Sequence, residues 1–227
     1  MKLEGKVVAV TGAFGQLGQA VVAEMVRQGA KVALLDIAEG KAPEGSAAWK
    51  VNLTSLADVK AALDGVAQRF GGIDALVNVA GGFRWQTLEG SADLGEWSAL
   101  FEINVLTCVT ASKSVLPHLQ KRGGGRIVNI GAMGAAKGST GMGAYAASKA
   151  AVARFTEALA DELKLKNITV NAVLPSIIDT PQNRQDMPDA DVDRWVKPTE
   201  IARVIGFLLS DSASAVTGAL LPVSGKT

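Results

Sequence analysis

The sequence has few of the residues that build disulfide frameworks, metal centres and nucleophilic triads. Its 227 residues include one cysteine, Cys108, one histidine, His118, and one tyrosine, Tyr145. A single cysteine excludes an internal disulfide framework and a cysteine-cluster metal site. A single histidine excludes a zinc site built from several histidines and argues against a histidine-based catalytic triad. We therefore predict no metal site.

The sequence also lacks a charge imbalance and a long hydrophobic run. Lys and Arg number 23 and Asp and Glu number 22, so the net charge is +1. This balance gives no electrostatic footprint for nucleic acid or for an anionic membrane. The longest uncharged stretch, residues 7–23, is short for a membrane span, and no segment typical of a signal peptide precedes it. We expect a cytoplasmic protein with a small-molecule substrate and with no nucleic-acid or membrane partner.

Short apolar runs alternate with longer segments of helical periodicity. The runs are mostly continuous, as in strands buried on both faces of a sheet. Such alternation predicts a doubly wound parallel sheet with helices on both faces and ligands at the carboxyl ends of the strands. We predict one α/β domain over residues 1–227, a Rossmann fold of about seven strands. The predicted strands are residues 6–10, 31–35, 47–51, 75–80, 126–130, 169–174 and 219–223, and the predicted helices are residues 17–28, 55–70, 94–119, 145–163 and 199–209.

The first predicted strand runs into a glycine-rich turn and then into a helix. Residues 11–18 read TGAFGQLG. Glycines allow the turn to approach a pyrophosphate closely, and Gly18 lets the helix pack near the sheet. This context favours a dinucleotide site over a purely structural glycine turn. The predicted contacts are Gly12, Phe14, Gly15, Gln16, Leu17 and Gly18 in the turn, with Asn52 and Leu53 after the third strand.

An acidic residue ends the second predicted strand. Asp36 lies 24 residues after Gly12, close to where a carboxylate would bind the adenosine ribose hydroxyls. A carboxylate there repels a 2′-phosphate, Ile37 follows it, and no Lys or Arg lies in the glycine turn. These features predict that NAD(H) is preferred over NADP(H). The alternative is an aspartate that only caps the next turn.

The lone tyrosine lies four residues before a lysine in a helical pattern. This spacing places Tyr145 and Lys149 on one helix face. A phenol of pKa about 10 is a poor acid or base at neutral pH, and a nearby ammonium favours the phenolate. We predict that Lys149 lowers the pKa of Tyr145 and makes it a working acid or base. Taken alone, the pair also fits a solvated helix face.

The two motifs together resemble those of the short-chain dehydrogenase/reductase family, over essentially the whole chain. Further matches are residues 78–81 (NVAG), 101–105 (FEINV), 125–130 (GRIVNI), 171–175 (NAVLP), 179–181 (DTP) and 198–202 (PTEIA). The resemblance implies a general acid/base role for Tyr145, a ribose contact from Lys149 and a water relay supported by Asn104. It also implies pairing of helices 94–119 and 145–163 with a partner's, in a homodimer or homotetramer. The implied cofactor contacts are the backbone of Asn78, Ala80 and Gly81, the side chains of Tyr145 and Lys149, and Pro175, Ile178 and Thr180 around the nicotinamide carboxamide.

Some positions depart from the usual family pattern. Ala132 stands thirteen residues before Tyr145, where the family has a serine that orients the substrate carbonyl. Loss of such a donor typically costs about a hundredfold or more in rate. The dihydropteridine reductase branch resembles this chain in Ala132, in the Gly15 spacing, in residues 79–83 and in residues 173–195. That resemblance implies reduction of a quinonoid pterin by NADH.

Three functions therefore stay open at this point. The first is hydride transfer between NAD(H) and a small carbonyl or alcohol, and the second is reduction of a pterin or similar conjugated imine or quinone. The third is a non-catalytic NAD(H)-binding sensor. We predict that Ala132, Trp85 and Trp195 contact the substrate. Arg84 and Arg184 are candidates for binding a substrate anion, with a solvated loop as the alternative.

Overall fold

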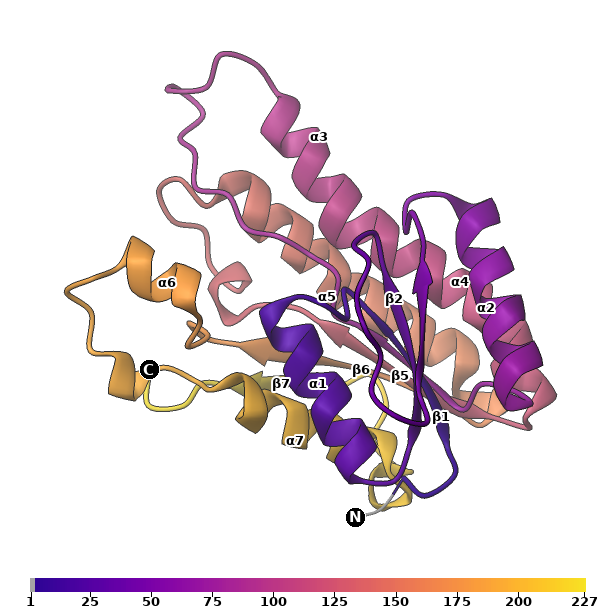
Figure 1. Ribbon diagram of the computed structural model, residues 1–227. Coiled ribbons are helices and arrows are strands. Elements are labelled where there is room, and N and C mark those ends of the chain that lie inside the picture. Colours follow the sequence, from indigo (N-terminus) through magenta and orange to yellow (C-terminus); the bar gives the residue numbers. More distant parts are fainter. Residues whose placement is uncertain (1–2) are drawn as a thin grey trace.

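The computed structural model describes residues 3–227 as one seven-stranded sheet with helices on both faces (Figure 1). Every neighbouring pair of strands is parallel, and the order is β3-β2-β1-β4-β5-β6-β7. The predicted doubly wound Rossmann fold is therefore confirmed. The strands are β1 (Val7–Thr11), β2 (Lys31–Asp36), β3 (Ala47–Lys50), β4 (Ala75–Asn78), β5 (Gly125–Ile130), β6 (Ile168–Pro175) and β7 (Leu220–Val223).

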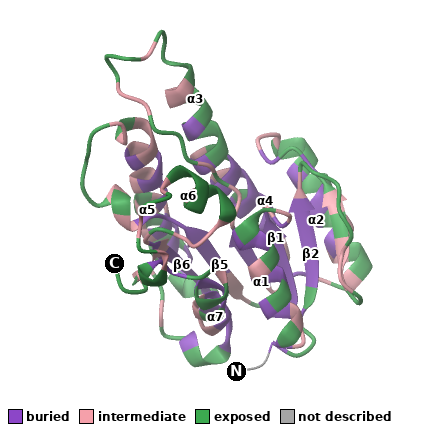
Figure 2. Ribbon diagram, turned by 60° about the vertical axis from the view of Figure 1, so that its left-hand side comes forward, coloured by how far each residue is buried: buried purple, intermediate pink, exposed green. Residues whose placement is uncertain are grey.

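The helices cover the two faces of the sheet in two layers, each with its own apolar core. Side chains alternate across each strand, so Val8 and Val10 face one layer while Val7 and Ala9 face the other. Figure 2 shows the buried strands between helices whose outer surfaces are exposed. The first layer holds α1 (Gln16–Arg27) and α7 (Pro198–Leu209), and the second holds α2 (Leu56–Phe70), α4 (Thr107–Lys121) and α5 (Gly143–Leu163).

The helix predicted over residues 94–119 is interrupted. It consists of α3 (Gly95–Phe101), a π-helical segment (Glu102–Leu106) and α4. π-helical turns are rare and often occur at functional sites, and this one contains Asn104. A further short helix, α6 (Pro181–Asp186), was not predicted and stands apart from the sheet layers in Figure 1.

Among the described residues, one helical stretch, Gly95–Lys121, has the length and apolar composition of a membrane span. Half of its most apolar window is buried inside the protein. Its Ala111, Val115 and Leu119 are fully buried in the second core with residues of the sheet. This stretch is therefore a core helix of the domain.

Candidate active site

The glycine-rich turn between β1 and α1 is packed so tightly that side chains would not fit at two positions. Gly12 has φ +61°, and a Cβ there would lie 2.8 Å from the Ala80 backbone. A Cβ at Gly18 would overlap the carbonyl oxygen of Gly12. Gly15, the N-cap of α1, makes no side-chain cap, so protein side chains leave the first N–H groups of the helix free. The turn is thus a cradle suited to a pyrophosphate at a helix N-terminus.

A cleft of about 500 Å³ opens above this cradle, at the carboxyl ends of β1, β2 and β4. Its only charged lining residues among those described are two carboxylates, Asp36 and Glu102. The structure brings ten of the predicted cofactor residues together on this cleft: Gly12, Gly15, Gln16, Leu17, Gly18, Asp36, Asn52, Leu53, Ala80 and Gly81.

The cleft also has a wall that the sequence analysis missed. Ala99, Glu102, Ile103 and Thr107 line it from the interrupted helix. Their spacing of three, four and eight residues is that of one helix face, so helical periodicity could have identified them. Ile37, Val51, Thr54 and Val79 complete the lining.

Asp36 lies at the mouth of the cleft with both carboxylate oxygens in use. Its Oδ2 accepts a hydrogen bond of 2.9 Å from the Phe14 N–H, and its Oδ1 accepts one of 3.0 Å from the Ala38 N–H. The carboxylate therefore caps the following turn, as the alternative interpretation required, and also lines the cleft. It fixes the glycine turn to the end of β2.

Seven predicted cofactor contacts do not line the cleft: Tyr145 and Lys149, which are described below, and five others. The Phe14 side chain packs against Gly40, and Asn78 is buried, donating to Ser112 Oγ at 3.0 Å and Asn129 Oδ1 at 2.9 Å. The remaining three belong to the segment that follows the sheet. Pro175 ends β6 in register with Val223, Ile178 forms a bridge with Val196, and Thr180 caps α6 by accepting from the Asn183 N–H.

Two of the three predicted catalytic residues, Lys149 and Asn104, meet at Gly81, which lines the cleft. Lys149 is buried, and its Nζ donates to the Ile130 carbonyl at 2.9 Å. A Cβ at Gly81 would lie 3.1 Å from Lys149 Nζ and 2.7 Å from Asn104 Oδ1. Tyr145 lies one helical turn before Lys149 on α5, and its ring meets Phe83 edge-on at 5.0 Å.

Asn104 uses its whole amide to hold the backbone beside the cleft. Its Oδ1 accepts from the Gly82 N–H at 2.9 Å, and its Nδ2 donates to the Gly82 carbonyl and to Ser148 Oγ. Ser148 Oγ donates in turn to the Tyr145 carbonyl. The Asn104 side chain therefore fixes the loop after β4 to α5 near Tyr145.

Burial sets the pKa values of the tyrosine and the lysine. It raises the pKa of Tyr145 to about 12 and lowers the pKa of Lys149 to about 8. The predicted lowering of the Tyr145 pKa by Lys149 is therefore not found in this structure. The physical reason is that the Lys149 ammonium turns to the Ile130 carbonyl, while burial of the phenol disfavours its charged form.

The three predicted substrate residues differ in how far their side chains are exposed. Ala132 is 8% exposed at the end of β5, and Trp85 is 61% exposed, with its Nε1 donating to the Thr140 carbonyl at 3.2 Å. Trp195 is only 5% exposed, so most of its ring packs inside the protein. The C-terminal segment runs beside it, because the Lys226 N–H donates to the Arg194 carbonyl.

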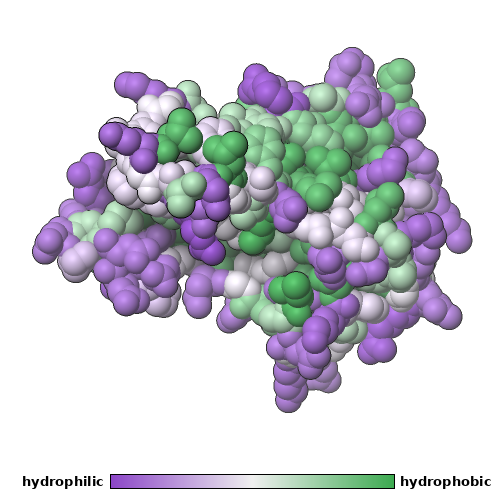
Figure 3. All heavy atoms as spheres, turned by 90° about the horizontal axis from the view of Figure 1, so that it is seen from above, coloured by the Kyte–Doolittle hydropathy of each residue, from purple (hydrophilic) through white to green (hydrophobic). Residues whose placement is uncertain are grey.

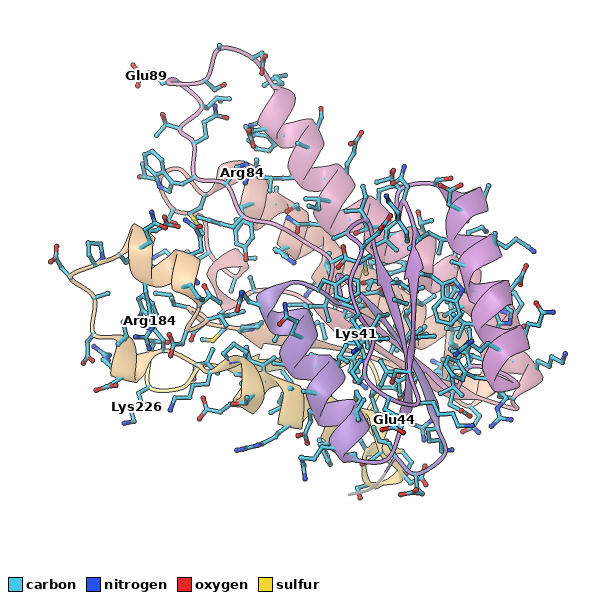
Figure 4. The ribbon with its side chains drawn as sticks, viewed as in Figure 1. Lys41, Glu44, Arg84, Glu89, Arg184 and Lys226 are labelled. Carbon is cyan, nitrogen blue, oxygen red and sulfur yellow. The ribbon has the colours of Figure 1, made fainter. Side chains whose placement is uncertain are left out.

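The two arginines proposed for a substrate anion both have protein partners. Arg184 on α6 makes a bidentate pair with Asp179, at 2.6 and 2.9 Å. Arg84, on the segment leading to α3, lies 3.6 Å from Glu96 Oε2. Figure 4 labels both side chains. Each arginine is therefore neutralised by a carboxylate of its own segment or of the next helix.

The parallel sheet and its glycine cradle define a dinucleotide-binding α/β protein, and comparison with known proteins identifies its family. Residues 6–191 match the family model for short chain dehydrogenase. The chain is 38% identical to 3-oxoacyl-[acyl-carrier-protein] reductase FabG of Pseudomonas aeruginosa, across 99% of this chain and 98% of that protein. It belongs to the short-chain dehydrogenase family of oxidoreductases.

Solved structures agree with this assignment. Ligand-free aldohexose dehydrogenase of Thermoplasma acidophilum superposes with a TM-score of 0.90 at 31% identity, covering 99% of this chain and 94% of that one. A 3-ketoacyl-(acyl-carrier-protein) reductase from Brucella melitensis complexed with NADH gives 0.88 at 30% identity, with 99% and 98% covered. These similarities support the family without supporting its dihydropteridine reductase branch.

Proposed function

We propose that this protein is an NAD(H)-dependent oxidoreductase that transfers a hydride between the nicotinamide and a small carbonyl or alcohol substrate. The observation that carries the proposal is the position of Lys149 beside the cleft at Gly81. Gly81 lines the cofactor cleft, and Lys149 Nζ would lie 3.1 Å from a Cβ at this residue. Tyr145 stands one helical turn away on the same helix. Binding groups and proton-transfer groups thus share one site.

In this mechanism the bound dinucleotide supplies or accepts the hydride, and the chain's own residues bind, orient and move a proton. The glycine turn and the start of α1 hold the pyrophosphate, and Asp36 holds the adenosine ribose. Lys149 binds the nicotinamide ribose, as the family resemblance implies. During reduction, Tyr145 would supply the proton that the substrate carbonyl oxygen takes up.

The charges of the cleft support NAD(H) over NADP(H). Asp36 and Glu102 are its only charged lining residues among those described, and neither would attract a 2′-phosphate. The solved relative from Brucella melitensis binds NADH. A carboxylate at the ribose therefore sets the preference.

The proposed substrate class, a carbonyl or an alcohol, agrees with the relatives, which are reductases of oxoacyl groups and a sugar dehydrogenase.

One observation favours a second candidate substrate, a flat conjugated imine or quinone such as a quinonoid pterin. Ala132 brings a buried methyl group to the position where a serine would orient a carbonyl. An electron-poor ring can accept hydride without that hydroxyl. A non-catalytic sensor is disfavoured, because the Lys149 ammonium lies beside Gly81, which lines the cleft.

We also propose a homodimer or homotetramer in the cytoplasm. Phe101, Ile103 and Leu106 are 39%, 42% and 43% exposed along α3 and the π-helical segment. Seen from above, apolar side chains gather over part of the molecular surface (Figure 3). Exposed apolar groups of this kind mark interaction surfaces. Light scattering at micromolar concentration should give two or four subunits, and a monomer would contradict the proposal.

The test is loss of NADH absorbance with purified protein and a panel of small ketones, aldehydes and a quinonoid dihydropterin. We expect turnover with NADH on at least one carbonyl compound. We expect the turnover rate to fall by about a hundredfold or more in Tyr145→Phe. NADH binding should survive this substitution, because it removes only the phenolic hydroxyl. Wild-type turnover in Tyr145→Phe would refute the catalytic assignment, and turnover on the pterin alone would favour the second candidate.

A further inference from the structure

A second hollow lies at the opposite end of the sheet from the cofactor cleft. Its volume is about 160 Å³, and it shares no lining residue with the cleft. It is built where β1, β4 and β5 begin, near the N-terminus at the lower edge of Figure 1. Its charged lining residues are three cations, Lys6, Arg122 and Arg126, and two carboxylates, Asp74 and Asp211.

Arg126 is a half-buried cation whose only carboxylate partner among the described residues is distant and exposed. Its side chain is 14% exposed, and its Nη1 donates to the Gly125 carbonyl at 3.0 Å. Its Nε is buried with no hydrogen-bond partner. The carboxylate that pairs with it, Asp211, lies 3.9 Å from Nη2 and is itself 92% exposed. A buried guanidinium normally requires a close, hydrogen-bonded anion.

The neighbouring strands do not supply that anion. Arg126 is in register with Ala75 on β4 and Thr169 on β6, and both side chains are neutral. Parallel neighbours in register project to the same face of the sheet, so these are the residues best placed to reach the guanidinium. Neither can neutralise it.

Asp74 is already committed to other groups. Its Oδ2 accepts from the Val7 N–H at 2.8 Å, and its Oδ1 accepts from Arg122 Nε at 3.0 Å and lies 2.9 Å from Arg122 Nη2. This carboxylate therefore neutralises Arg122. Lys6 has no ion-pair partner among the described residues of the chain. Two positive charges, on Lys6 and Arg126, thus face the hollow against one exposed carboxylate.

We propose that this hollow is a binding site for a small phosphate-class oxyanion, held by the Arg126 guanidinium and the Lys6 ammonium. The Arg126 Nη2, whose carboxylate partner is 3.9 Å away, and the exposed Lys6 ammonium have N–H groups that one oxyanion can accept in charge-assisted hydrogen bonds. An oxyanion here would supply the partner that Arg126 lacks and would offset the cost of burying its charge. Inorganic phosphate and the phosphate of a small monoester present the same chemistry to these two groups.

The test is calorimetric titration of inorganic phosphate into the full-length protein saturated with NADH, at constant ionic strength. Saturation with NADH keeps the titrant out of the glycine cradle. We expect one phosphate per chain, with affinity reduced about tenfold or more in Arg126→Gln, because hydrogen bonds to charged groups contribute that much. A parallel titration with glycerol 3-phosphate separates a free-phosphate site from a monoester site, and binding of either supports the proposal.

Two further variants keep the test decisive. Lys6→Gln changes an exposed side chain, so it should fold normally and should also weaken phosphate binding. Arg154→Gln removes the same charge from an exposed pair with Glu157 on α5 and should leave phosphate affinity unchanged. Absence of binding to the wild-type protein would overturn the proposal. So would equal affinity in the wild type, Arg126→Gln and Lys6→Gln, since any bound anion would then lie elsewhere.

Discussion

Replacing Asp36 by Asn should shift the cofactor preference toward NADPH by about 10- to 100-fold. The side chain lines the cleft, and its two oxygens are held by the Phe14 and Ala38 N–H groups. Asn keeps the shape and one oxygen acceptor while it removes the charge. A unit charge about 5 Å from a phosphate contributes about 3 kcal/mol at an effective dielectric of 20. Partial exposure of Asp36 and screening by salt reduce this to about 1–3 kcal/mol.

The measurement is the ratio of kcat/KM for NADH to kcat/KM for NADPH with one acceptor at constant ionic strength. Most of the change should come from improved use of NADPH, since Asn can still bind a ribose hydroxyl. Glu44→Gln is the matched control, because it removes an equal charge from an exposed position outside the cleft. A ratio that is unchanged in Asp36→Asn, or that moves equally in Glu44→Gln, would refute the electrostatic reasoning.

Three further predictions follow from the same geometry. Gly18→Ala should weaken NADH binding by about tenfold or more and lower the melting temperature, because the new Cβ would overlap the Gly12 carbonyl oxygen. Gly15→Ala should be tolerated, because its Cβ would lie 3.4 Å from the same oxygen. Equal effects of the two substitutions in thermal melts and NADH titrations would contradict this prediction. Ala132→Ser should raise kcat/KM for a small ketone by about tenfold or more if the substrate is a carbonyl, and should leave turnover of a quinonoid pterin unchanged. Burial lowers the pKa of Lys149 from 10.5 to about 8, so the unfolded chain binds this proton more tightly than the folded chain does. Relative to Lys149→Met, the free energy of unfolding should therefore rise by about 1.4 kcal/mol per pH unit between about pH 8 and 10. The same pH dependence of unfolding in the two proteins would refute this prediction.

The strands and the glycine cradle could be predicted because their signals are local in the sequence. Continuous apolar runs mark strands that are buried on both faces, and all seven predicted strands overlap those observed. The cradle follows from a glycine pattern between a strand and a helix. The start of α6 was also readable, since Thr180 caps it and Pro181 occupies its first turn.

The missed features depend on contacts between distant segments. The π-helical interruption at Asn104 accompanies hydrogen bonds from its side chain to Gly82 and Ser148, which lie far away in the sequence. Trp195 is buried beside the C-terminal residues, a contact that no local pattern encodes. Residue type and spacing limited the candidates, and packing decided where each side chain went.

The Tyr145–Lys149 pair shows most clearly why spacing alone does not determine chemistry. A separation of four residues brings two positions together on a helix, but Lys149 extends its ammonium to the Ile130 carbonyl. Burial then dominates both groups and favours the neutral phenol, with a pKa of about 12. A neutral phenol carries the proton that reduction of a carbonyl requires, but the raised pKa makes it a weaker acid than a free phenol. Oxidation needs a phenolate, so it requires additional positive charge near Tyr145, which an oxidised nicotinamide carries. Because oxidation of an alcohol by NAD⁺ releases a proton, higher pH should favour that direction.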